Sequence, residues 1–186
     1  MLCSLDLLAS VCLRPRARAP ETARVALLIE DFPRPQHPSA EFAELLFLLR
    51  EHGAKATFVV GWQGIRSRGL GTAVADMMRL LQHEGHEVAI RFSVDVCGAS
   101  QLTQHVAEAL HFLQRVYGIT VVSAKLGGRM HCAGEAALRS LGVTVVDGIG
   151  TQRVVRDTAD LLHDAEVELA RMRGAPCVCV RDLVCT

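Results

Sequence analysis

Two adjacent carboxylates, Glu30 and Asp31, directly follow the apolar run of residues 25–29, and this run is typical of a buried strand. A carboxylate pair in this position can bind a metal ion, carry out acid–base catalysis or offset nearby cations. Which chemistry applies depends on the residues at the ends of the other strands. The residues at those strand ends are therefore the next candidates for a site.

Further residues that could bind a metal ion follow later in the chain. His131 and Cys132 come after the fourth apolar run and could join aspartates in a metal site of mixed ligands. The aspartates in question are Asp31, Asp95 and Asp147. The spacing of this set matches no known metal motif. The histidine-rich residues 83–87 are expected to be the end of a helix that runs into a strand.

Short apolar runs alternate with helical patterns along the chain. The runs predict strands at residues 25–29, 56–60, 87–92, 119–122, 143–146 and 177–180. Helices are expected from residue 39 to about 53, and at about 72–84, 100–118, 133–141 and 158–173, with a loop at 61–71. Strands this apolar, each followed by a helix, predict a parallel sheet covered by helices, as an open sheet or a barrel. In both architectures the site lies at the carboxyl ends of the strands.

The composition restricts the class of protein. The chain has 186 residues, of which 50% are hydrophobic, and its formal net charge is zero. These values predict one domain with a real core and exclude disorder and charge-driven binding of nucleic acid. The seven cysteines are an odd number without regular spacing, which favours a reducing, intracellular compartment. We expect no membrane span, because no apolar run is long enough.

The N-terminal segment, residues 1–20, is apolar and then rich in arginine. Its arginines follow the apolar stretch, which is opposite to the order in a secretory signal. An arginine-rich start would suit a mitochondrial presequence and the mitochondrial matrix, although Asp6 opposes this. We expect residues 1–20 to form a docked helix or targeting-like segment, and residues 21–186 to form the domain.

Three stretches carry a resemblance to a known family. They are "VALLIEDFP" (residues 25–33), "LLREHGAKATFVVG" (residues 48–61) and "LLQHEGHEVAIRF" (residues 80–92). Together they resemble the polysaccharide deacetylase superfamily, the NodB-type carbohydrate esterases, and "KLGGRM" (residues 125–130) resembles a motif of its divergent branch. The resemblance implies an α/β fold, a NodB-like distorted (β/α) barrel with parallel strands in a single domain. It also implies a hydrolase that acts on C–N bonds of carbohydrates.

The resemblance also assigns roles to positions of this chain. The family's first aspartate is the general base and its second binds a divalent metal with two histidines, so Glu30 would be the base and Asp31 a ligand. The two histidine positions fall on Arg91 and Asp95. A histidine of the divergent branch falls on Lys125, and the family's late histidine falls near Arg181.

Basic residues at these histidine positions indicate that the metal-binding chemistry of the family is absent. Arginine and protonated lysine cannot coordinate a metal, but they can replace its charge beside buried carboxylates. We therefore expect a catalytically inactive, deacetylase-like domain without a cofactor, with a structural or binding role among protein partners in an assembly. Its expected charge-replacement cluster comprises the vestigial Glu30 and Asp31 with Arg91, Lys125, Arg181, Asp95 and Asp147.

One alternative stays open at this point. An active metal-dependent deacetylase would use Glu30 as base and a rebuilt ligand set for a metal such as zinc, with a carbohydrate substrate. The ligands would come from Asp31, Asp95 and His131, or from Asp147. If the charge replacement holds instead, and if its ion pair is buried, Arg91→Ala should cost roughly 3–5 kcal/mol of stability.

Overall fold

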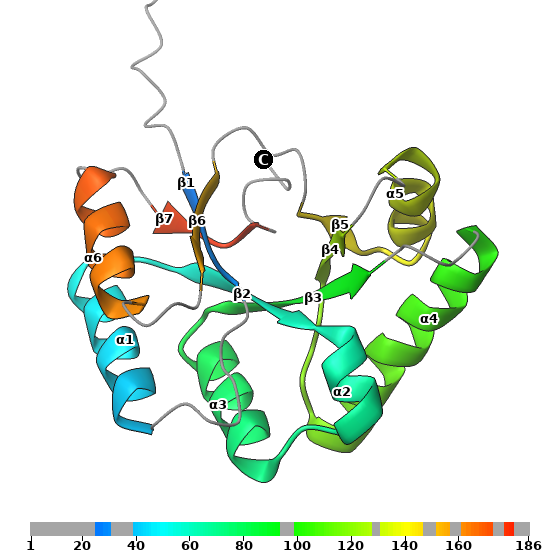
Figure 1. Ribbon diagram of the computed structural model, residues 1–186, viewed down its shortest axis with the longest axis horizontal. Coiled ribbons are helices and arrows are strands. Elements are labelled where there is room, and N and C mark those ends of the chain that lie inside the picture. Colours follow the sequence, from blue (N-terminus) through cyan, green and yellow to red (C-terminus); the bar gives the residue numbers. More distant parts are fainter. Residues whose placement is uncertain are drawn as a thin grey trace, which may run out of the picture.

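The computed structural model describes residues 25–30, 39–93, 99–127, 131–146, 152–156, 161–172 and 177–180. Helices alternate with strands along most of these ranges, except that α3 follows α2 and β6 follows β5 (Figure 1). The elements are β1 (Val25–Glu30), α1 (Ser39–Glu51), β2 (Ala56–Gly61), α2 (Trp62–Arg68), α3 (Thr72–His83), β3 (Glu87–Ser93), α4 (Ala99–Phe112), the π-helical segment η1 (Leu113–Tyr117), β4 (Ser123–Gly127), α5 (His131–Ser140), β5 (Thr144–Val145), β6 (Gln152–Arg156), α6 (Leu161–Arg171) and β7 (Cys177–Val178).

The strands form one parallel sheet in the order β5-β4-β3-β2-β1-β6, and β7 pairs with the start of β1. The sheet curls into a half-barrel, and the helices cover its outer side (Figure 1). This arrangement confirms the predicted α/β fold with parallel strands. The N-terminal segment, residues 1–20, lies outside the described residues. Among the described helices, none has both the length and the apolar character that crossing a membrane requires.

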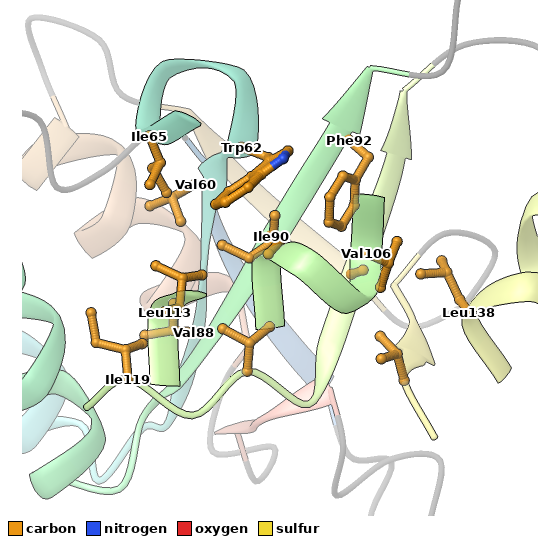
Figure 2. Packing of buried hydrophobic residues seen from close by; sticks show 14 of the residues in the cluster. Val60, Trp62, Ile65, Val88, Ile90, Phe92, Val106, Leu113, Ile119 and Leu138 are labelled. Atoms are coloured by element: carbon orange, nitrogen blue, oxygen red, sulfur yellow. The ribbon is translucent and has the colours of Figure 1, made fainter. Parts of the chain in front are cut away.

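Two apolar clusters hold the helices against the outer side of the sheet. One packs β2, β3 and β4 against α2, α4 and α5, and Figure 2 shows Trp62 and Phe92 within it. The ring centroids of Trp62 lie 6.5 Å from Phe92 and 6.0 Å from Phe112. The other cluster packs β1 and β2 against α1 and α6. A third, smaller cluster lies on the inner side of the sheet.

The predicted loop at residues 61–71 is wrong, because residues 62–68 form the helix α2. Trp62 and Ile65 stand one helical turn apart, and both are buried in the outer core. Glycine and arginine suggested a loop, but two apolar residues at helical spacing were sufficient to anchor a short helix against β3.

The fourth strand lies later in the chain than predicted. Residues 119–121 do not pair in the sheet; the Val122 carbonyl accepts a hydrogen bond from the Thr144 amide, and β4 begins at Ser123. Gln82 explains the difference, because its side-chain amide binds both the backbone N–H and the carbonyl of Thr120. Ile119 is still buried, so its apolar side chain reflects a place in the core and does not indicate a strand.

The strand β6 was not predicted. Its five residues contain only two apolar side chains, Val154 and Val155, between arginines, which is a weak strand signal. It pairs with β1 along residues 26–30. The predicted boundary between α3 and β3 is confirmed: the helix ends at His83 and the strand begins at Glu87.

Candidate functional site

Side chains on the inner side of the curled sheet form three layers, because alternate residues of a strand face the same side. We call them the floor, the middle and the mouth. The floor, near the amino ends of β3 and β4, holds Thr57, Glu87 and Ser123. The middle is apolar and comprises Ala26, Leu28, Val59, Ala89, Val146 and Val180. The mouth, at the carboxyl ends, holds Glu30, Arg91 and Lys125.

The mouth is built around the carboxylate of Glu30, which is 4% exposed. The ammonium of Lys125 donates a hydrogen bond to Glu30 Oε1. A guanidinium nitrogen of Arg91 lies 4.0 Å from Glu30 Oε2, on the other side of the carboxylate. Both oxygens of one buried carboxylate therefore meet basic groups, which offsets the cost of taking its charge out of water.

The strand register explains how these side chains meet. Arg91 pairs with Lys125 across β3 and β4, and with Gly61 across β2 and β3. The guanidinium passes close to Gly61, since a Cβ there would lie 3.9 Å from it. The missing side chain of Gly61 leaves the inner side of β2 open, so that Arg91 and Lys125 can extend across it toward β1.

This arrangement limits what the mouth can do chemically. Protonated lysine and arginine have no free lone pair for a metal ion, and they repel cations. The described residues contain no group of three histidine, cysteine, aspartate or glutamate side chains that could hold a metal. The described part of the mouth therefore does not fit a divalent metal, and we derive no metal-dependent step from it.

Several predicted site residues fall outside the described part of the chain. These are Asp31, Asp95, Asp147 and Arg181. His131 begins α5, but only its backbone is described. Thus the structure brings together Glu30, Arg91 and Lys125, and leaves the other predicted members as expectations.

The sequence analysis missed the floor. Glu87 is 2% exposed, and Thr57 Oγ1 donates to its Oε2 at 3.0 Å. Ser123 donates to Glu87 Oε1, and the Val180 amide donates to Thr57 Oγ1 at 3.0 Å. The floor thus joins β2, β3 and β4 to the C-terminal residues 177–180. Its signal in the sequence was an acidic residue at the start of an apolar strand.

His86, beside the floor, is buried and neutral near pH 7. Its Nδ1 accepts a hydrogen bond from the Ala56 amide at 3.2 Å. Burial lowers the pKa of His86 to about 4, with a smaller contribution from the positive charge of Lys55. The histidine that looked metal-like in the sequence is therefore a structural group that joins β2 to β3.

Cys177 and Cys179 close the amino end of the sheet near β1 and β2. Burial raises the pKa of the Cys177 thiol to about 11, so it stays protonated at neutral pH. The Cys179 thiol lies 3.5 Å from the Ala56 carbonyl. A protonated, buried thiol is a poor metal ligand and a poor nucleophile, which favours packing as the role of Cys177.

Comparison with solved structures identifies the fold. The structure of a family 4 carbohydrate esterase pseudoenzyme from Bacillus anthracis matches with a TM-score of 0.66 and 10% identity, over 89% of this chain and 66% of that one. A family 4 carbohydrate esterase from the same organism matches with a TM-score of 0.61 and 15% identity, over 87% and 82% of the two chains. The chain therefore has the fold of the family 4 carbohydrate esterases.

Two further structures share this fold. A family 4 carbohydrate esterase from Streptomyces lividans, in complex with acetate, gives a TM-score of 0.60 at 17% identity, over 83% of this chain and 91% of that one. A mutant of the pseudoenzyme with restored enzymatic activity gives 0.66 at 8% identity, over 89% and 68%. No protein-family model and no curated protein matches the chain. At such identities the likeness shows the fold, and the fold does not decide between activity and inactivity.

Proposed function

We propose that this NodB-type domain is catalytically inactive and has a structural or binding role. One observation carries the proposal: the ammonium of Lys125 is hydrogen-bonded to Glu30, the residue that the family resemblance places as the general base. The ammonium occupies the carboxylate oxygen Oε1, with which a general base would accept a proton from water.

Arg91 supports the same conclusion. It stands where the resemblance expects a histidine ligand, and its guanidinium lies 4.0 Å from Glu30. A divalent metal in this place would face two fixed positive charges, from Arg91 and Lys125. When bound in such a fold, the metal supplies the activation of a water molecule. The two basic residues instead supply charge compensation, which maintains the fold but activates no water.

We further propose that the domain works as a subunit of a larger intracellular assembly, in the mitochondrion or another reducing compartment. The seven cysteines and the apolar, arginine-rich N-terminal segment support this.

The alternative is an active N-deacetylase with rebuilt ligands, a metal such as zinc and a carbohydrate substrate. It is favoured by the esterases among the similar structures, of which one was solved with acetate. In this case Asp31, Asp95 and His131 would hold the metal, and Lys125 would have to leave Glu30.

The test is a hydrolysis assay of the full chain with acetylated chitooligosaccharides and with added zinc or cobalt. An active family 4 esterase under identical conditions is the positive control. We expect no release of acetate above that of the Glu30→Gln variant. Metal-dependent release that the Glu30→Gln variant loses would overturn the proposal and support the alternative.

A further inference from the structure

We infer that Arg156, at the end of β6, is a further member of the basic cluster around Glu30, and that this cluster holds the half-barrel together across its inside. The inference rests on the proposed function, in which the basic residues replace a metal.

The register of β1 carries the inference. Glu30 pairs with Val59 on the β2 side and with Arg156 on the β6 side. Paired residues of neighbouring parallel strands lie on the same face of a sheet, and the strands are about 4.8 Å apart. The backbone position of Arg156 is therefore beside Glu30, on the inner face. Lys125 and Arg91 approach Glu30 from the opposite direction, from β4 and β3.

The sheet topology gives the cluster its structural role. Within the described residues, β6 pairs only with β1, and it does not pair with β5 at the other end of the sheet. Among the described strands, backbone hydrogen bonds thus leave an opening between β5 and β6. A carboxylate on β1 with basic residues from β3, β4 and β6 links both sides of this opening.

The position of Arg156 also bears on Arg181. The sequence analysis assigned the late basic position to Arg181, which lies outside the described residues. Its neighbour Val180 donates its amide to Thr57 in the floor, whereas Glu30 and Arg156 pair at the carboxyl ends. The strand register thus places Arg156 beside Glu30, and the position of Arg181 stays a prediction.

The test is a double-mutant cycle on the full chain, with the melting temperature as the readout. The variants are Glu30→Gln, Arg156→Met and their combination, with Arg153→Met as the matched control. Arg153 lies on the same strand but pairs with Leu27, which packs in the outer cluster. Arg156→Lys tests whether charge alone is sufficient, and Arg181→Met tests the competing assignment.

We expect Arg156→Met to lower Tm by roughly 4 °C or more, and Arg153→Met by less than about 2 °C. In the Glu30→Gln background, Arg156→Met should lower Tm little or raise it, because the buried negative charge that the Arg156 guanidinium would offset is then absent. Arg156→Lys should restore most of the loss. An equal loss in both backgrounds, or coupling of Glu30 to Arg181 in place of Arg156, would overturn the inference.

A parallel cycle with Lys125→Met separates this inference from the proposed function. Coupling of Glu30 to Lys125 without coupling to Arg156 would overturn the inference alone, and absence of both couplings would count against the proposed function. If the Glu30→Gln chain does not fold, Arg156→Glu is compared with Arg153→Glu in the native background. We expect Arg156→Glu to lower Tm at least about twice as far, and equal losses would overturn the inference.

Discussion

The Lys125 ammonium is hydrogen-bonded to the Glu30 carboxylate, although β2 and β3 lie between their strands in the sheet. This bond crosses the inside of the half-barrel and shields the carboxylate of Glu30, whose side chain is 6% exposed. A catalytic site would place a ligand or water there. In this domain the ammonium of Lys125 takes that position.

Removing the lysine should destabilise the fold. Lys125→Met leaves Glu30 buried without its hydrogen-bonded cation, and we expect a loss of about 2–4 kcal/mol in the free energy of unfolding. Arg91→Met should cost about 1 kcal/mol, below the value expected for a buried pair, because the Arg91 side chain is 32% exposed and its nitrogen stands 4.0 Å from Glu30. Urea denaturation measures both. Lys55→Met is the control, since Lys55 binds the Glu84 carbonyl at the surface; an equal loss in the control would refute this account of Lys125.

Stability should depend on pH through His86. The pKa of this histidine is about 4 in the folded state, below its ordinary value of 6.5, so the unfolded chain binds more protons between these values. The stabilisation from neutral His86 is therefore complete above pH 6.5 and decreases as the pH falls toward 4. The total loss should be about 3 kcal/mol.

Urea denaturation between pH 4 and pH 8 checks this. His86→Asn should remove most of that pH dependence, since asparagine keeps an acceptor for the Ala56 amide but does not titrate. The exposed His83→Asn is the control and should keep the wild-type profile. An unchanged profile in His86→Asn would show that other groups cause the acid loss.

The floor should hold the C-terminal residues in place through Thr57. Thr57→Val removes a donor to Glu87 and the acceptor of the Val180 amide, and should cost about 1–3 kcal/mol. Hydrogen exchange separates the two effects. The Val180 amide should lose protection in Thr57→Val but keep it in Ser123→Ala, which affects only Glu87 among these contacts. Equal exchange of Val180 in both variants would contradict this role.

Restoring one histidine should not restore catalysis. In Arg91→His the Lys125 ammonium still binds Glu30 and repels a cation, so we expect no turnover of acetylated chitooligosaccharides with zinc or cobalt. The measurement is acetate release, compared with the parent chain. Turnover in this single variant would show that Lys125 does not block the site.

The sequence was sufficient to predict the fold where strands were apolar and ended at glycine or charged residues. Residues 25–30 and 56–61 have this pattern, and the structure shows them as strands. The prediction was wrong where tertiary contacts override the local pattern. The Gln82 side chain hydrogen-bonds to the backbone of Thr120, which therefore does not join a strand. Residues 152–156 form β6 because they pair with β1, although the segment contains two arginines.

The candidate site was predictable only in part, for a similar reason. Glu30 was identified because two carboxylates after a buried strand are costly without compensation. Its register with Arg156 depends on β6, which carries no clear strand signal. The buried Glu87 could not be distinguished from an ordinary residue at a strand start until its contacts with Thr57 and Ser123 were seen.

The central claim is that basic side chains take the place of a metal beside Glu30. Its most direct test is the divalent metal content of the purified full chain, with zinc or cobalt binding measured by titration calorimetry in parallel with Asp31→Ala. We predict less than one equivalent of metal, and no binding that Asp31→Ala abolishes. One equivalent of bound metal that disappears in Asp31→Ala would contradict the claim.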